Sequence, residues 1–271
     1  MKATGSALLI SALAGCGGQN GEGTETTASE TTMGNETTSM GNETTMGNET
    51  TTEGNETTDG TTTDGDGEAN LRVVHASPDA PNVDVYVDDA EALTDVPFGT
   101  VSDYLPLSTG SHAVRITAAG DPDTVVFDEE VELMAADYTA VAQGELEEGA
   151  ENAFSVQVLE DDAEAPGSDT AAVRLVHLSP DAPAVDVTVE SSGDAIFDGV
   201  AFGETATAEV PAGDYTLQVR GDTDGNDGDV AASFDVTVEG GSEYTAFAVG
   251  YLTPDDEPAD AGFDLLVAEG A

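Results

Sequence analysis

The chain has 271 residues with 56 acidic and 5 basic side chains, which gives a formal net charge of −51. This balance excludes a nucleic-acid partner, because a phosphate backbone is held by clustered Lys and Arg, and it excludes electrostatic docking on anionic lipid. Only 12 of the 56 acidic residues precede residue 70. The charge therefore coats the part that is expected to fold, which is typical of adaptation to high salt.

Residues 1–16 have the pattern of a lipoprotein signal peptide. The apolar segment 3–13 is too short to cross a membrane, and it is followed by Ala14, Gly15 and Cys16. This arrangement resembles a lipoprotein box, in which small residues fit a peptidase groove and the cysteine thiol carries the lipid. We therefore expect lipid attachment at Cys16, the only cysteine, and a location on the extracytoplasmic face of the cell membrane. The alternative is an unprocessed tail with a free thiol.

Residues 17–69 are rich in Thr, Gly, Asn and Glu and contain almost no apolar side chains. Such a segment buries too little apolar area to offset the entropy of ordering, so it is predicted to be a disordered stalk. A repeated Met-Gly-Asn-Glu-Thr-Thr unit supplies Asn-Glu-Thr acceptors, although a Thr-rich repeat also produces such triplets by accident. Glycosylation is expected at one or more of four asparagines: Asn35, Asn42, Asn48 and Asn55.

An internal repeat follows the stalk. Residues 71–88 match residues 173–190 at 12 of 18 positions, and both stretches contain His-x-Ser-Pro-Asp-Ala-Pro-x-Val-Asp-Val. Two copies of one domain are therefore assigned, copy one at 70–162 and copy two at 172–271. The polar segment 163–171 between them reads as a short linker.

Each copy is predicted to be an all-β sandwich. Short β-type runs alternate with turn signals, and no stretch shows sustained helical periodicity. Val83, Val85 and Val87 alternate with polar or amphipathic residues, which is the period of a half-buried strand. The predicted fold is two tandem β-sandwich domains, immunoglobulin-like or prealbumin-like, after a disordered stalk. The sequence does not separate these two topologies.

The duplicated motif, at residues 75–85 and 177–187, resembles the signature of domain of unknown function family 4397. Members of this family are secreted or anchored proteins of bacteria and archaea, often with paired copies. The resemblance covers residues 71–271 and implies a β-rich extracytoplasmic domain. It implies no activity, because none is established for the family.

The polar residues of the motif allow three interpretations. Their types could form a hydrolase triad, but their i, i+2, i+4 spacing places them in a row along a strand, and a triad needs Ser and Asp on opposite nitrogens of one imidazole. A rigid corner is the favoured interpretation, with two prolines and an Asp that accepts N–H bonds in an Asx-turn. In the third interpretation these side chains contact a partner. The residues are His75, Ser77, Asp79, His177, Ser179 and Asp181.

A polar turn in copy two is a weak candidate for Ca²⁺. Oxygen-bearing side chains recur within residues 222–229, but the EF-hand pattern fails because Asp227 stands at its glycine position. A solvated hairpin turn is the favoured interpretation, and no cofactor is expected. His112 replaces a tyrosine of copy two and is expected to be a packed side chain. The candidate ligands are Asp222, Asp224, Asn226 and Asp229.

Taken together, these features predict a non-enzymatic, lipid-anchored surface protein that presents two β-sandwich modules for binding or envelope structure. The expected partner is an envelope protein or a glycan. Two alternatives remain open: an extracytoplasmic hydrolase that uses the duplicated His/Ser/Asp motif, and a ligand-binding receptor. The receptor is the weaker of the two, because two small sandwiches are not expected to form a cleft between lobes.

Overall fold

The computed structural model describes residues 65–161 and 166–270. The predicted signal peptide with Cys16, the four glycosylation acceptors and most of the predicted stalk lie outside these ranges. The described residues form strands and one short 3-10 helix, with no α-helix among them, and they contain no helix that is long and apolar enough to cross a membrane.

The strands of copy one are β1 (Gly65–His75), β2 (Val83–Val87), β3 (Ala90–Val96), β4 (Leu105–Ala118), β5 (Asp121–Leu133), β6 (Asp137–Gln143) and β7 (Ser155–Glu160). The elements of copy two are β8 (Thr170–His177), β9 (Val185–Val189), β10 (Ala195–Val200), β11 (Thr205–Pro211), β12 (Gly213–Gly221), β13 (Val230–Val238), β14 (Glu243–Val249), the 3-10 helix η1 (Pro254–Asp256) and β15 (Asp264–Glu269).

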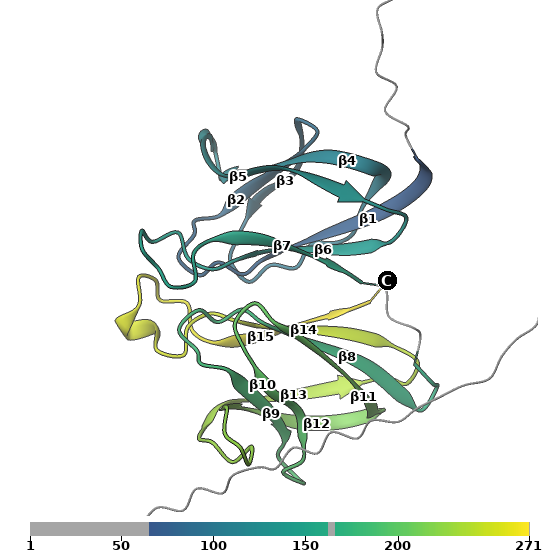
Figure 1. The fold of residues 1–271 in the computed structure, drawn as a ribbon, viewed down its shortest axis with the longest axis vertical. Helices are drawn as coiled ribbons and strands as arrows, with labels where there is room; N and C mark the ends of the chain where they lie inside the picture. Colours follow the sequence, from purple (N-terminus) through teal and green to yellow (C-terminus); the bar gives the residue numbers. More distant parts are fainter. Residues whose placement is uncertain (1–64, 162–165, 271) are drawn as a thin grey trace, which may run out of the picture. The chain divides into compact units, whose positions relative to one another are not determined.

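In copy one, the long strand β4 runs through both layers of the sandwich. The strand order is β3-β2-β4-β1-β6-β7, with β5 also paired to β4 (Figure 1). The first part of β4 pairs with β1 and its second part pairs with β2 and β5. The main core between the layers consists of five buried aliphatic side chains, Val73, Val83, Val85, Val96 and Ile116. Val83 and Val85 of β2 face this core, as their alternation predicted, but Asp84 between them is also buried, so the strand is not half-buried.

In copy two, the corresponding path is cut into two strands, which leaves two separate sheets, β10-β9-β12-β13 and β11-β8-β14-β15 (Figure 1). The cut falls at Pro211 and Gly213, where proline has no N–H for the ladder. The core between the sheets contains Leu175, Val185, Val187, Phe197 and Val219. The all-β, sandwich-type fold predicted from the sequence is confirmed in both copies.

Strand β1 begins at Gly65, inside the range predicted as stalk. Glu68 and Ala69 pair with Ser108 and Leu107 of β4, and Ala69 is fully buried. The boundary at residue 69 was therefore placed too late. Composition misses this part of β1 because the pairing uses backbone hydrogen bonds, which polar residues and glycine can also supply.

A further apolar cluster joins the two copies, which both lie within one compact unit, Asp59–Ala271. Because successive side chains of a strand point to opposite faces, β1 places Val73 in its own core and Val74 in the shared cluster. In the same way, β8 places Leu175 in its own core and Val176 in the shared cluster. The shared cluster contains Val74, Ala76, Val141, Val176, Leu178, Phe247 and Val249. Burial on both faces explains why each of these two strands carries two consecutive apolar residues at this point.

Candidate functional site

The duplicated motif forms a buried corner after the first strand of each copy. In copy one, the His75 ring is fully buried, its Nε2 lies 3.1 Å from the carbonyl oxygen of Pro81, and Phe98 packs against the ring edge-on. The Ser77 hydroxyl donates a hydrogen bond of 2.6 Å to the carbonyl of Gly144. The corner is therefore tied to the chain that leaves β6.

Asp79 fastens the same corner to the loop between β6 and β7. Its two carboxylate oxygens accept hydrogen bonds from the backbone N–H groups of Leu146 and Glu147, each at 2.9 Å. The expected local Asx-turn is therefore wrong. The Asp accepts N–H bonds, as predicted, but the donors come from a loop that is distant in the sequence and that only the tertiary fold brings to the corner.

Copy two repeats this arrangement. Asp181 accepts hydrogen bonds from the N–H groups of Leu252 and Thr253, both at 2.8 Å. The Nε2 of His177 lies 3.0 Å from the carbonyl oxygen of Pro183. The matched contacts show that the motif performs the same structural task in both copies: it holds the loop that follows the second strand of the β1-β6 or β8-β14 parallel pair.

The triad interpretation does not fit this geometry. The Ser77 hydroxyl bonds to Gly144 and, at 3.3 Å, to Asp79, and the Ser179 hydroxyl bonds to Asp181 at 3.2 Å. Within the described residues, neither hydroxyl has a hydrogen bond to a histidine ring. Both serines and both histidines are fully buried, so these four side chains are out of reach of a substrate or a docking partner in this structure.

Burial also sets the charge state of the two corner histidines. It lowers the pKa of the ring below its ordinary value in both His75 and His177, because the imidazolium form would lose its hydration. The carbonyl bonds of Pro81 and Pro183 act in the opposite direction but are the smaller effect. Both rings are therefore neutral at neutral pH.

Two arginines at matched positions cross from one copy to the other. Arg72 of β1 donates from Nη1 to the carbonyl of Glu269 at 2.9 Å, and Arg174 of β8 donates from Nη1 to the carbonyl of Glu160 at 2.8 Å. The two contacts are reciprocal, because each arginine reaches the last strand of the other copy. This pair was not predicted from the sequence, although two of the four arginines in the repeat region stand at equivalent motif positions.

Asp161 joins the two arginines. Its carboxylate side chain is 3% exposed, it forms an ion pair with Arg174, and it lies 3.5 Å from Arg72. It also accepts hydrogen bonds from Thr139 at 2.5 Å and from Tyr104 at 2.7 Å. Burial and this carboxylate raise the pKa of the Tyr104 hydroxyl far above its ordinary value, so the phenol stays protonated.

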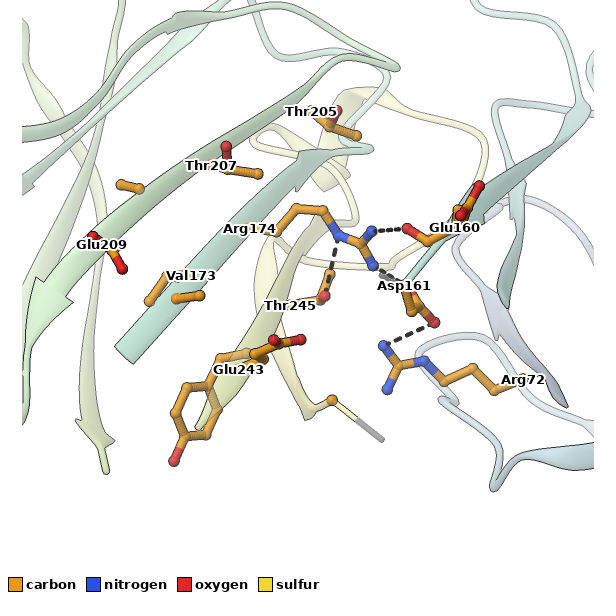
Figure 2. A pocket seen from close by; sticks show the side chains of 14 residues that line it. Arg72, Glu160, Asp161, Val173, Arg174, Thr205, Thr207, Glu209, Glu243 and Thr245 are labelled. Atoms are coloured by element: carbon orange, nitrogen blue, oxygen red, sulfur yellow. Dashed lines mark hydrogen bonds and ion pairs between the residues drawn. The ribbon is translucent and has the colours of Figure 1, made fainter. Parts of the chain in front are cut away.

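A groove opens beside this network, on the outer face of the β11-β8-β14-β15 sheet. Its volume is about 620 Å³, and residues of both copies line it. Figure 2 shows Arg174 in the middle, with contacts to Thr245, Glu160 and Asp161, and Thr207 on the neighbouring strand. No such cleft between the copies was expected from the sequence, because the order of residues does not show which part of a sheet face the other copy leaves uncovered.

Three carboxylates of copy two lie close enough together to hold a cation. Asp186, Asp198 and Asp222 each place an oxygen within 4.8 Å of the others, and the amide of Asn226 faces Asp186 and Asp198. Desolvation and the neighbouring carboxylates raise the pKa of Asp222. Of the predicted calcium ligands, the structure brings Asp222 and Asn226 to this cluster and adds two residues from other strands. Asp224 and Asp229 are not in it.

Asp186 is the buried member of this cluster, and it already supports the chain. It accepts N–H bonds from Gly199 at 2.9 Å and Thr223 at 3.1 Å. Its counterpart Asp84 in copy one accepts the same kind of bond from Asp95 and Gly120, and these two bonds lower the pKa of Asp84. The role that this motif residue has in both copies is therefore to hold two turns, and among the residues that the structure describes only copy two adds a group of carboxylates to it.

His112 is a packed side chain, as expected. Its Nδ1 lies 2.7 Å from a carboxylate oxygen of Asp88, and its Nε2 lies 2.8 Å from the carbonyl oxygen of Ser108. Two acceptors on one ring favour the doubly protonated form. Burial acts to lower the pKa of His112, but the bonds to Asp88 and Ser108 together raise it above its ordinary value. In copy two, the Tyr215 hydroxyl makes the equivalent bond to the carbonyl of Pro211.

Comparison with known proteins identifies a family. The family model described as "Domain of unknown function (DUF4397)" matches residues 69–188 and 186–269. No curated protein matches the sequence.

Solved structures with similar features are distant. CBMbc (family CBM26) from Eubacterium rectale Amy13K, solved in complex with maltoheptaose, is 11% identical, with a TM-score of 0.23, and the match covers 75% of this chain and 97% of that chain. The TIE protein of Bacillus anthracis is 12% identical, with a TM-score of 0.22 and coverage of 68% and 34%. A leucine-rich repeat protein of Bacteroides thetaiotaomicron is 14% identical, with a TM-score of 0.19 and coverage of 69% and 26%.

Proposed function

The chain belongs to the DUF4397 family, and we propose that it is a non-enzymatic cell-surface lipoprotein whose paired β-sandwiches bind a component of the envelope. The observation that carries the proposal is how the duplicated motif is used. Its Asp side chains hold two loops, β6–β7 and β14–β15, and its His and Ser side chains are buried, so the motif stabilises a surface and offers no accessible serine nucleophile.

The loops that the two corners hold also contact the other copy. The Tyr251 hydroxyl donates to a carboxylate oxygen of Glu145 at 2.8 Å, and the Asn152 amide donates to the carbonyl of Pro180 at 2.8 Å. These bonds join parts of both copies at one place in the compact unit. Such a joined loop surface supports a binding role better than two independent domains would, because a partner would meet it already ordered.

The anchor is part of the same proposal. Cys16 carries the lipid, the segment from residue 17 to the start of β1 at Gly65 acts as a stalk, and one or more of its asparagines are glycosylated. Replacing Cys16 with Ser is expected to release the protein from membranes into the medium. An intact, unmodified Met1 in the mass spectrum of the mature protein would contradict the anchor.

The binding role is tested by capture from native envelope in high salt with the anchored protein, followed by identification of the retained protein or glycan. The rival hydrolase predicts covalent labelling of Ser77 or Ser179 by a serine-reactive probe. Labelling of the folded protein at either serine would overturn the proposal that the protein is not an enzyme. The absence of any retained envelope component would overturn the binding role.

Adaptation to high salt has its own test. With 56 acidic and 5 basic side chains, the charges repel each other at low ionic strength and are screened as the Debye length falls from about 10 Å at 0.1 M to about 3 Å at 1 M. The melting midpoint is expected to rise steeply with KCl concentration. A midpoint that does not depend on salt would contradict this part of the proposal.

A further inference from the structure

The two copies place different side chains at one matched position beside the crossing arginines. In copy two, Thr207 of β11 stands directly opposite Arg174 of β8. In copy one, Leu71 of β1 stands opposite Leu105, so the preceding residue, Tyr104, lies opposite Arg72. Tyr104 and Thr207 are therefore structural equivalents, one large and aromatic and the other small.

In copy one this position is filled. The Cζ of Arg72 lies 4.9 Å from the centre of the Tyr104 ring, which is the geometry of a cation–π contact. The hydroxyl of the same tyrosine donates to Asp161. Under this ring the Arg72 side chain is only 3% exposed.

In copy two the same position is open. Thr207 has no ring to cover Arg174, and within the described residues no aromatic side chain stacks on that guanidinium. The Arg174 side chain is 16% exposed, and it lines the groove of about 620 Å³. Figure 2 shows Arg174 and Thr207 next to each other on neighbouring strands, with side chains directed to the same side of the sheet.

The contacts of Arg174 restrict what the groove can take. Each of its three guanidinium nitrogens already donates, to Thr245, to the carbonyl of Glu160 and to Asp161. A carboxylate or phosphate would compete with these acceptors and would also meet the carboxylates of the lining, including Glu209. The Arg174 side chain is 16% exposed and carries no stacked ring within the described residues, and a flat, neutral ring is a group that binds the face of a guanidinium.

We propose that this groove is a seat for a tyrosine side chain presented by a partner protein, stacked on Arg174 as Tyr104 is stacked on Arg72. The proposal deepens the binding role proposed above and rests on it. Copy one shows the chemistry that fits: a ring over the guanidinium and a phenol hydroxyl beside acidic side chains. The acidic lining selects the neutral phenol and disfavours a phosphorylated one.

In the direct test, the purified full-length protein is titrated with N-acetyl-tyrosinamide in high salt. The chemical shift of the side-chain Nε–H of Arg174 is measured by NMR. The expected result is a saturable shift, because a stacked ring changes the local magnetic field. N-acetyl-leucinamide and the phosphorylated tyrosine amide serve as matched probes and are expected to cause no saturable shift. No shift with the tyrosine amide, or an equal shift with the leucine amide, would overturn the proposal.

A variant supplies the ring from within the chain. Thr207→Tyr copies the arrangement of copy one and is expected to shift the Arg174 resonance, to raise the melting midpoint by about 2 °C or more and to abolish the response to the tyrosine amide. Thr207→Leu is the matched control, because it fills the groove without a ring; it should block the probe but leave the resonance of the free protein in place. Thr207→Phe repeats the test if the first variant folds poorly.

A response to the tyrosine amide that survives in both Thr207→Tyr and Thr207→Leu would place binding elsewhere and would also overturn the seat. These outcomes are independent of the envelope capture experiment. A captured partner together with an unresponsive Arg174 would leave the binding role standing and remove the tyrosine seat. A responsive Arg174 without a captured partner would show that the groove takes a tyrosine ring but would remove the envelope partner, and with it the role proposed for the seat.

Discussion

Copy one and copy two share a signature motif and a strand order, but they differ in what surrounds three matched positions. Copy one has Tyr104 on its arginine, a hydrogen-bonded pair at His112 and Asp88, and, within the described residues, no group of three carboxylates around Asp84. Copy two has an open arginine, a tyrosine in place of the histidine, and an acidic cluster around Asp186. The motif therefore determines the corner structure that both copies share, and residues outside the motif determine the surface chemistry of each copy.

The largest effect on stability is expected from replacement of Asp161, whose carboxylate contacts an arginine of each copy. The Asp161→Ala variant removes the buried carboxylate that Arg72 and Arg174 share. Removal of one partner of a buried ion pair lowers the free energy of unfolding by about 3–5 kcal/mol. Chemical denaturation should show this loss in the free energy of unfolding. Glu160→Ala is the control, because that residue offers its backbone carbonyl to Arg174 while its side chain is exposed. Equal stability of the two variants would contradict the role of Asp161.

The next effect concerns the corners. Asp79→Asn and Asp181→Asn each weaken charge-assisted bonds to two loop N–H groups, which is expected to lower the free energy of unfolding by about 1.5–3 kcal/mol. The loss should be larger for Asp181, because it also accepts a bond from the Thr253 hydroxyl. Thermal melts of both variants measure this. An unchanged midpoint combined with loss of captured partners would instead assign the corners a direct docking role.

A pH effect separates His112 from the corner histidines. His112 has a raised pKa in the folded state, so its stabilising contribution is present below the ordinary pKa of about 6.5 and is lost as pH rises through the folded value. The His112→Tyr variant introduces the residue that copy two has at the equivalent position. It should lower the free energy of unfolding by about 0.5–1 kcal/mol in acid and by less at alkaline pH. Denaturation across pH 5–9 measures the difference between the variant and the parent. A constant difference would contradict the ion pair with Asp88.

The corner histidines should show the opposite trend. The pKa of His75 and of His177 is lowered in the folded state, so the unfolded chain takes up protons first as pH falls below about 6.5. Stability is therefore fully present above that pH and declines as the pH falls toward the folded pKa values. The parent protein is expected to lose stability in this window, and the loss should remain in the His112→Tyr variant, which keeps both corners.

The smallest effect is expected at the acidic cluster. The Asp222→Ala variant introduces the residue of copy one, because Ala119 stands at the equivalent position of its turn. The variant removes the repulsion between Asp222 and the carboxylates of Asp186 and Asp198. The midpoint should rise slightly at low salt and match that of the parent protein at high salt, because salt screens exposed charges. Since the pKa of Asp222 is raised, the gain should shrink as the pH falls and the carboxyl takes up a proton. A gain that persists in high salt would show that repulsion is not its cause.

The sequence by itself determined the class of fold, the duplication and the corner. Alternation at Val83, Val85 and Val87 and the absence of helical periodicity follow from local side-chain geometry, so they are visible in any strand before it finds its partners. The two prolines around Asp79 restrict the backbone locally in the same way. The family resemblance was proposed from this local pattern, and the match to the DUF4397 model confirms the family.

Only the tertiary structure decided which distant residues meet. Asp79 finds its N–H donors in another loop, Asp161 binds arginines from both copies, and the acidic cluster exchanges two of its predicted members for residues of other strands. Such contacts depend on which faces the sheets bury against each other, and side-chain alternation indicates that a face is buried without indicating what covers it. The open position above Arg174 is therefore invisible in the order of residues, and it exists because the neighbouring strand of copy two carries Thr207 where copy one carries a tyrosine.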